Sequence, residues 1–178
     1  MQLFSLVSFT SSQAFPSARI EGIIARSGPS LQLTYRLFSD PQSLRIPAPA
    51  AIPERRHKLW EETCFELFLA AKGAPGYWEF NLSPAGPWNV YRFAGYRQAM
   101  AEEQAFAALP FTVTAEAGGL SLGLEIDLEK ILPAAPSLEA GLSAILRSAG
   151  GEVAYWALAH PGPAPDFHRR EGFLLSLA

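Results

Sequence analysis

Hydrophobic and polar side chains alternate along several short segments of this chain. The clearest example is residues 77–92, YWEFNLSPAGPWNVYR, where two aromatic-rich runs flank a turn containing Pro and Gly. A period of two places successive side chains on opposite faces of a β-strand, so the segment predicts a β-hairpin. The first strand has an apolar face with Trp78, Phe80 and Leu82, and a second face with Tyr77, Glu79 and Asn81.

Residues 63–69 repeat this pattern just upstream. Phe65, Leu67 and Leu69 point one way, and Cys64, Glu66 and Phe68 point the other way. If the two segments are neighbours in one sheet, Glu66, Glu79 and Asn81 form a polar row framed by aromatic rings. We expect a ligand on that face.

The rest of the chain also reads as short strands with Gly and Pro turns and little helix. Further strands are predicted at residues 3–9, 18–26, 31–38, 44–46, 111–116, 120–126, 138–147, 152–160 and 173–177. The helix formers at 98–105 allow a turn or two of helix, and Asp127 is an N-cap for one helical turn at 127–131. About ten antiparallel strands in a single domain, residues 1–178, predict an all-β sandwich.

The alternation also predicts which side chains form the hydrophobic core. Its predicted members are Phe65, Leu67, Leu69, Trp78, Phe80, Leu82, Leu122, Leu124, Trp156 and Leu158.

Composition excludes some classes of partner. The net charge of −3 suggests neither a nucleic-acid nor a membrane-surface partner, and the cluster Arg55–Lys58 lies beside glutamates, as in a solvated loop. No apolar run approaches the ~20 residues that span a bilayer. No basic residue precedes Arg19, so a secretory n-region is missing and we expect a cytoplasmic protein. Cys64, the one cysteine, allows no internal disulfide and reads as buried and unreactive.

Catalytic and metal motifs fit their contexts poorly. Residues 119–123 match G-x-S-x-G, but Ser121 lies in an alternating strand and not at a strand-to-helix turn. His160, Asp166 and His168 are weak metal candidates without an evident fourth ligand. The simpler interpretation is that Asp166 orients a loop and the histidines bond its backbone. Glu66 and Glu79 suit general acid/base chemistry if their side chains converge.

A binding site is the favoured interpretation of the polar row. We expect Glu66, Glu79 and Asn81 to bind a small hydroxyl-rich ligand, with Trp60 or Trp88 at a strand start as a partly exposed stacking ring. An arginine fork from Arg92 would hold one glutamate and leave the other for the ligand. The alternative is an ion-paired network of Glu66, Glu79 and Arg92 without a ligand.

Four segments carry a resemblance to a known family: LWEETCFELFL at 59–69, YWEFNLSP at 77–84, YWALAHP at 155–161 and PDFH at 165–168. From Leu59 onward the sequence resembles bacterial DOMON-like domain proteins, which in turn resemble family 9 carbohydrate-binding modules. The resemblance implies an immunoglobulin-like or jelly-roll β-sandwich that binds sugars or haem. Trp60 lies in the matching motif as a candidate stacking residue. Haem-binding relatives use Met and His ligands, and the two methionines of this chain are Met1 and Met100.

These observations rank the functions. A non-catalytic module for a glycan or other small molecule comes first, with no cofactor. A haem-binding redox domain comes second. An enzyme that uses Glu66 and Glu79, or His160, Asp166 and His168, and an interaction domain without a small ligand remain alternatives. Oligomeric state is left open.

Overall fold

The computed structural model describes residues 1–50, 52–133 and 136–178, and its described part is all-β. Its strands are β1 (Gln2–Ser8), β2 (Arg19–Ser27), β3 (Ser30–Phe38), β4 (Cys64–Ala71), β5 (Tyr77–Leu82), β6 (Trp88–Phe93), β7 (Ala101–Glu102), β8 (Phe111–Glu116), β9 (Gly119–Asp127), β10 (Leu138–Arg147), β11 (Val153–Ala157) and β12 (Leu175–Leu177). The helices in these ranges are short 3-10 turns: η1 (Pro41–Ser43), η2 (Leu59–Glu61), η3 (Leu128–Lys130) and η4 (Arg170–Gly172). None of them is long and apolar enough to cross a membrane.

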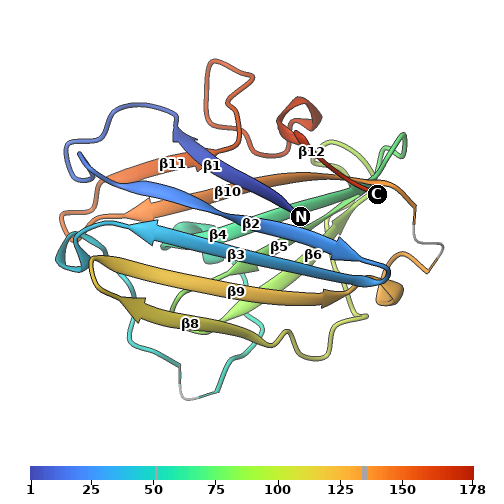
Figure 1. Cartoon of the computed structure of the whole chain (residues 1–178), viewed down its shortest axis with the longest axis horizontal. Coiled ribbons are helices and arrows are strands. Elements are labelled where there is room, and N and C mark those ends of the chain that lie inside the picture. The colour runs from blue at the N-terminus through green and yellow to red at the C-terminus, as the bar shows by residue number, and fades with distance from the viewer. Residues whose placement is uncertain (51, 134–135) are drawn as a thin grey trace.

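The strands form one continuous antiparallel sheet that curls back on itself. The strand order is β7-β6-β5-β4-β10-β11-β1-β2-β3-β9-β8, and β12 pairs with β10. We call β1, β2, β3, β9 and β8 sheet A, which faces the viewer in Figure 1. We call β7, β6, β5, β4, β10, β11 and β12 sheet B. Strand β1 joins the two, because its first residues pair with β2 while Val7 and Ser8 pair with β11.

A single large core fills the space between the two sheets. The ring of Tyr35 from sheet A lies 5.2 Å from the ring of Phe65 in sheet B. The Tyr35 hydroxyl donates a hydrogen bond of 2.6 Å to the backbone carbonyl of Glu66, which ties the two sheets together at their centre. All ten predicted core residues belong to this cluster, with Trp78 and Leu158 partly buried at its margin.

The predicted hairpin at 77–92 is confirmed as β5 and β6. Leu82 pairs with Trp88 across the turn, which the Ser83 amide closes by donating to the Pro87 carbonyl at 2.9 Å. Gly86 has φ of 109°, a left-handed conformation that favours glycine. The two faces of β5 are as predicted: Phe80 and Leu82 enter the core, and Glu79 and Asn81 lie on the other face.

Two expectations about the elements are wrong. Residues 44–46 do not form the predicted strand, because only Leu44 pairs there, in an isolated bridge to Ser148. Residues 98–105 do not form a helix. The chain there turns through Arg97 and Ala99 at positive φ and then adds β7 to the sheet edge. The expected turn after Asp127 is present as η3, and the Asp127 carboxylate accepts from the Glu129 amide at 3.1 Å.

We predict that Phe80→Ala lowers the free energy of unfolding by about 3–5 kcal/mol, because the ring is fully buried and its removal leaves a cavity. Urea melts followed by tryptophan fluorescence measure this loss. Leu174→Ala is the control, since Leu174 is exposed. Equal midpoints for Phe80→Ala and wild type would contradict the core assignment.

Candidate functional site

Polar side chains cross the outer face of sheet B in two neighbouring rows. The strand register places Ser143 on β10 beside Glu66 on β4, Glu66 beside Asn81 on β5, and Asn81 beside Asn89 on β6. The next row contains Phe68, Glu79, Tyr91 and Glu102. Glu66 and Glu79 are therefore diagonal neighbours on adjacent strands, as the alternating sequence predicts.

This face is covered. The cover is a strap of residues 159–172 between β11 and β12, which is the orange-red segment at the top of Figure 1. The His168 ring on the strap packs edge-on against three rings of the sheet, with centroids 5.3 Å from Phe68, 5.9 Å from Tyr77 and 5.1 Å from Phe93. These rings and Phe173 form a second, smaller apolar cluster, and Trp60 and Phe167 lie half-buried at its edge.

The two glutamates are almost completely buried beneath this cover. Glu66 is 3% exposed and Glu79 is 4% exposed. The Ser143 hydroxyl donates to Glu66 Oε2 at 2.9 Å, and the Asn81 amide donates to Glu79 Oε1 at 2.7 Å. Among residues 1–50, 52–133 and 136–178, one basic group lies within 4.0 Å of either carboxyl: His168, whose Nε2 is 3.8 Å from Glu79 Oε2.

Burial shifts the proton equilibria of these groups. Burial, together with the nearby charge of Glu79, raises the pKa of Glu66 to about 8, and burial raises the pKa of Glu79 to about 7. Burial lowers the pKa of His168 to about 4. At neutral pH the imidazole is therefore neutral, and the carboxyl pair retains protons that two exposed glutamates would have lost.

A hydrogen-bonded chain holds His168 in place. The backbone amide of Arg97 donates to the Tyr77 hydroxyl at 3.2 Å, and that hydroxyl lies 2.8 Å from His168 Nδ1. Because the hydroxyl accepts from the amide, its own proton is free to bond Nδ1, which leaves the imidazole proton on Nε2 facing Glu79. Asp166 holds the strap from the other side by accepting from Tyr96 at 2.5 Å and Arg97 at 2.9 Å.

A second polar network lies at the β6 side of the face. Asn89 accepts from Arg55 Nη1 at 2.6 Å and donates to Tyr91 Oη and to Glu102 Oε1, each at 2.9 Å. His57 is 3.3 Å from the same Glu102 oxygen. Trp60, which the sequence selected as a stacking ring, packs edge-on against Tyr91 with centroids 5.9 Å apart. The segment from Arg55 to Trp60 is thus fixed to the sheet as one wall of the site.

Two of the expected binding residues lie elsewhere. Trp88 is 2% exposed and belongs to the central core, under the Arg55 guanidinium at 4.5 Å, so the expectation of a partly exposed ring is wrong. Arg92 pairs with Trp78 in the register and therefore points to the opposite face from Glu79. An ion pair between Arg92 and either glutamate is excluded by this placement.

The weak metal candidates do not converge. His160 Nε2 lies 2.9 Å from the Val7 carbonyl, while Asp166 and His168 have the separate partners described above. The described residues contain no group of three or more His, Cys, Asp or Glu side chains that could hold a metal ion. Met100, which a haem site would need as a ligand, is 47% exposed in the turn before β7.

Sequence reasoning missed several contributors to this face. Asn89 and Tyr91 alternate with Trp88 and Val90, so the period-two rule applied to β6 would have found them. Ser143 could have been found in the same way on β10. Tyr96 and Arg97 carry no such signal, because they lie in a turn and contact the site through Asp166 and, for the Arg97 amide, through the Tyr77 hydroxyl.

Chemically, the face offers buried carboxyl, amide and hydroxyl groups beside half-buried aromatic rings. This combination suits a small polar ligand with apolar ring faces, since the rings supply stacking and the polar groups fix orientation. Cys64 lies next to the pair, with Sγ 3.6 Å from Asn81 Oδ1. Burial raises the pKa of its thiol well above the usual value, which opposes a role as a nucleophile.

The fold resembles that of sugar-binding proteins. A crystal structure of a candidate carbohydrate-binding protein from Bacteroides uniformis superimposes with a TM-score of 0.73 at 15% identity, covering 99% of this chain and 85% of that one. Two structures of a family 9 carbohydrate-binding module from Caldicellulosiruptor kristjanssonii, one with glucose and one with cellotriose, give TM-scores of 0.54 and 0.52. Both are 10% identical to this chain and cover 88% of it, with 73% and 72% of their own chains matched.

No protein-family model matches the sequence, and no curated protein does. At these identities the likeness establishes the fold class and leaves the ligand to be argued from the site.

The raised carboxyl pKa values predict how stability depends on pH. A carboxyl group whose pKa rises on folding stabilises the native state fully below its unfolded pKa of about 4.5, and this contribution is lost as pH rises through about 7 and 8. We expect the free energy of unfolding to fall from about pH 4.5, where the unfolded carboxyls lose their protons, to about pH 8, where the folded carboxyls have lost theirs. Between about pH 4 and pH 6.5 the lowered pKa of His168 offsets part of this fall, and above pH 6.5 His168 is neutral in both states and adds no slope.

Glu66→Gln tests this assignment, because its amide resembles the protonated carboxyl. The variant should match wild type near pH 4, below the unfolded pKa of a glutamate, and be more stable by a few kcal/mol near pH 9. Guanidinium melts at both pH values measure the difference. The control is Glu125→Gln, an exposed carboxyl on β9. An equal pH slope for Glu66→Gln and wild type would show that Glu66 ionises normally.

Cys64 is fully buried, so we predict that a thiol reagent such as Ellman's reagent labels the native protein far more slowly than the urea-unfolded protein. The ratio of the two labelling rates measures its protection. Rapid labelling of the native protein would contradict the position of β4 in the sheet.

Proposed function

We propose that this chain is a non-catalytic binding module for a small hydroxyl-rich ligand, most simply a sugar, on the outer face of sheet B. One observation carries the proposal. Glu66 Oε1 and Glu79 Oε2 accept no hydrogen bond from the residues that the structure describes, although both side chains are more than nine-tenths buried. Each carboxyl thus keeps one oxygen free to bond a ligand hydroxyl group, in a site that is otherwise nearly closed.

The aromatic residues at the edge of the face support a sugar in particular. Trp60 and Phe167 are half-buried on the two segments that cover the sheet, and each presents a ring beside the polar row. Aromatic faces stack on the apolar faces of pyranose rings, while carboxyl and amide groups bond the equatorial hydroxyls. Asn81 and Ser143 hold the carboxyls in fixed orientations for this purpose.

Ligand entry requires the cover to move. The cavity beneath the strap, lined by Phe68, Ser143, Asp166 and Phe167 among others, has a volume of ≈ 10 Å³. That is room for about one water molecule and not for a sugar ring. Arg170 holds the end of the strap by bonding Glu139 and the Ala71 and Ala74 carbonyls, and Asp166 and His168 hold its middle. A ligand that bonds Glu79 would replace the nearby His168 and displace this middle part outward.

The structural neighbours guide the choice of ligand. Two of them are described as complexes with glucose and with cellotriose, so these two sugars are the first probes. The competing interpretation is a buried polar network that stabilises the fold and binds nothing. The two interpretations differ in how variants affect stability and binding.

We predict that isothermal titration calorimetry detects binding within a panel of neutral mono- and oligosaccharides that begins with glucose and cellotriose. Glu79→Gln and Trp60→Ala should each weaken binding by on the order of 10- to 100-fold, because each loses one buried polar contact or one stacking surface. The matched controls are Glu125→Gln and Phe111→Ala on sheet A, which should bind like wild type.

Two results would overturn the proposal. One is the absence of any heat for the wild type across the panel. The other is a Glu79→Gln variant that loses stability in urea melts yet binds normally, since this pattern identifies a structural network.

A further inference from the structure

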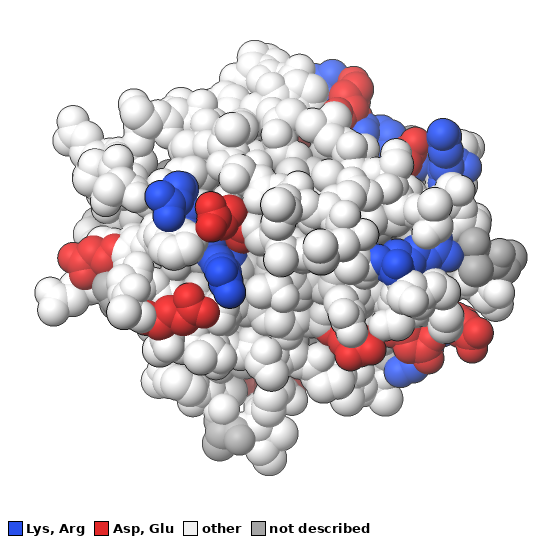
Figure 2. Space-filling model, viewed as in Figure 1, with Lys and Arg blue, Asp and Glu red and all other residues white. Residues whose placement is uncertain are grey.

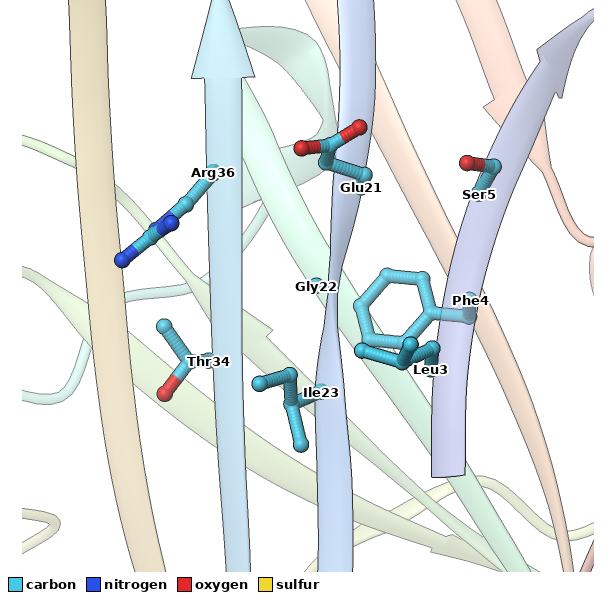
Figure 3. Close-up of a pocket in the computed structure, with 8 residues that line it drawn as sticks. All are labelled: Leu3, Phe4, Ser5, Glu21, Gly22, Ile23, Thr34 and Arg36. Atoms are coloured by element: carbon cyan, nitrogen blue, oxygen red, sulfur yellow. The ribbon is translucent and has the colours of Figure 1, made fainter. Parts of the chain in front are cut away.

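The outer face of sheet A carries two rows of side chains that run across four neighbouring strands, β1, β2, β3 and β9. The strand register defines both rows. The polar row is Ser5, Glu21, Arg36 and Ser121. The second row is Leu3, Ile23, Thr34 and Gly123. Figure 3 shows the first three members of each row around a shallow hollow, whose volume is ≈ 560 Å³.

The side chains of the second row project from the sheet at the β1 end and leave a gap at the β9 end. Leu3 on β1 is 76% exposed and Ile23 on β2 is 39% exposed, so apolar surface stands out from this half. At the β9 end Gly123 has no side chain, and only the hydroxyl of Thr112, 3.0 Å from the place a Cβ would occupy, borders that position. The face as a whole is sparsely charged, with small clusters of charged side chains toward its edges (Figure 2).

We propose that this face is an isologous interface between two copies of this chain. A two-fold axis parallel to the strands, midway between β2 and β3, would place each row over the same row of the second copy and exchange β2 with β3 and β1 with β9. Glu21 of one copy then faces Arg36 of the other. Ile23 faces Thr34, and the projecting Leu3 lies over the gap at Gly123.

Charge complementarity favours a second copy of this chain as the partner that binds this face. Among the described residues Arg36 makes no ion pair and no side-chain hydrogen bond, and Glu21 reaches only Arg19, at 3.8 Å. Each copy therefore offers one free cation and one weakly engaged anion side by side in the same row. The two-fold operation pairs both, which gives two ion pairs beside the axis, next to the row that contains Ile23 and Leu3.

The size of the face fits a weak dimer. Four strands spaced ~4.8 Å apart, with about nine residues each at ~3.3 Å per residue, give a footprint of roughly 500–600 Å² per copy. The total of about 1,100 Å² is near the lower limit for specific interfaces, so we expect dissociation in the micromolar range or weaker. Sheets that stack face to face commonly keep their strand directions within about 30° of each other, so the proposed arrangement is an ordinary one.

This surface is independent of the proposed sugar site. The rows lie on sheet A, whereas Glu66, Glu79 and the strap lie on the outer face of sheet B. Dimerisation through sheet A leaves both ligand faces open, on opposite sides of the assembly.

Sedimentation equilibrium of the full chain, from about 1 μM to about 1 mM, tests the proposal. We expect a monomer–dimer equilibrium that Leu3→Ser weakens by about 10- to 100-fold, because two apolar side chains are lost per dimer. Glu21→Arg and Arg36→Glu should each weaken the dimer, and the double variant should restore it by reversing both members of each ion pair. The control is Leu174→Ser, an equally apolar residue that is 57% exposed outside sheet A.

Two outcomes would overturn the proposal. The proposal is wrong if the chain stays monomeric up to the highest concentration. The partner of this face would then be a different protein or a small amphipathic molecule. A dimer that is unaffected by Leu3→Ser and by both single charge reversals overturns the proposal as well, because its interface lies elsewhere. Circular dichroism confirms folding of each variant, and the exposed position of Leu3 keeps the test valid if a charge reversal fails to fold.

Discussion

Two carboxyl groups buried in the middle of one sheet face constrain the structure around them. Glu66 and Glu79 lie on adjacent central strands, where water does not reach and where Arg92 points away. Three features offset the free-energy cost of burying these two carboxyl groups. Ser143 and Asn81 each donate one hydrogen bond, burial keeps protons on the pair, and the strap excludes bulk water with a neutral imidazole. The tie of Tyr35 to the Glu66 carbonyl fixes the backbone beneath them from the other sheet.

The local pattern was sufficient to predict the strands that carry this pair. Alternation in β4 and β5 correctly assigned each side chain to a face, because a buried sheet admits only one phase of the period-two pattern. The core residues followed from the same rule. Helix propensity at 98–105 gave a wrong prediction. The Arg97 amide bonds Tyr77 and the chain pairs with the sheet edge, and such tertiary contacts outweigh weak helix propensities.

Long-range relations could not be read from the sequence. The length and form of the turn at 83–87 set the register Leu82–Trp88, and that register alone decides that Tyr91, and not Arg92, sits beside Glu79. The position of the strap could be predicted even less, because His168 contacts Tyr77 from a loop that is distant from it in the sequence. Nothing local to a Pro-rich loop indicates which sheet face it will cross. The sequence therefore indicated a loop ordered by Asp166, with a metal site as a weak alternative, and did not predict that this loop covers the glutamates.

Strand β1 has a further consequence, for the order in which the molecule assembles. Its residues Val7 and Ser8 pair with Ala157 and Trp156, which lie far away in the sequence. The pairing of β1 with β11 therefore cannot form until β11 has been synthesised. Until then the unpaired edge of β1 remains available to other chains. Closing so large a loop carries a high entropic cost, so this pairing belongs among the late and slow events of folding.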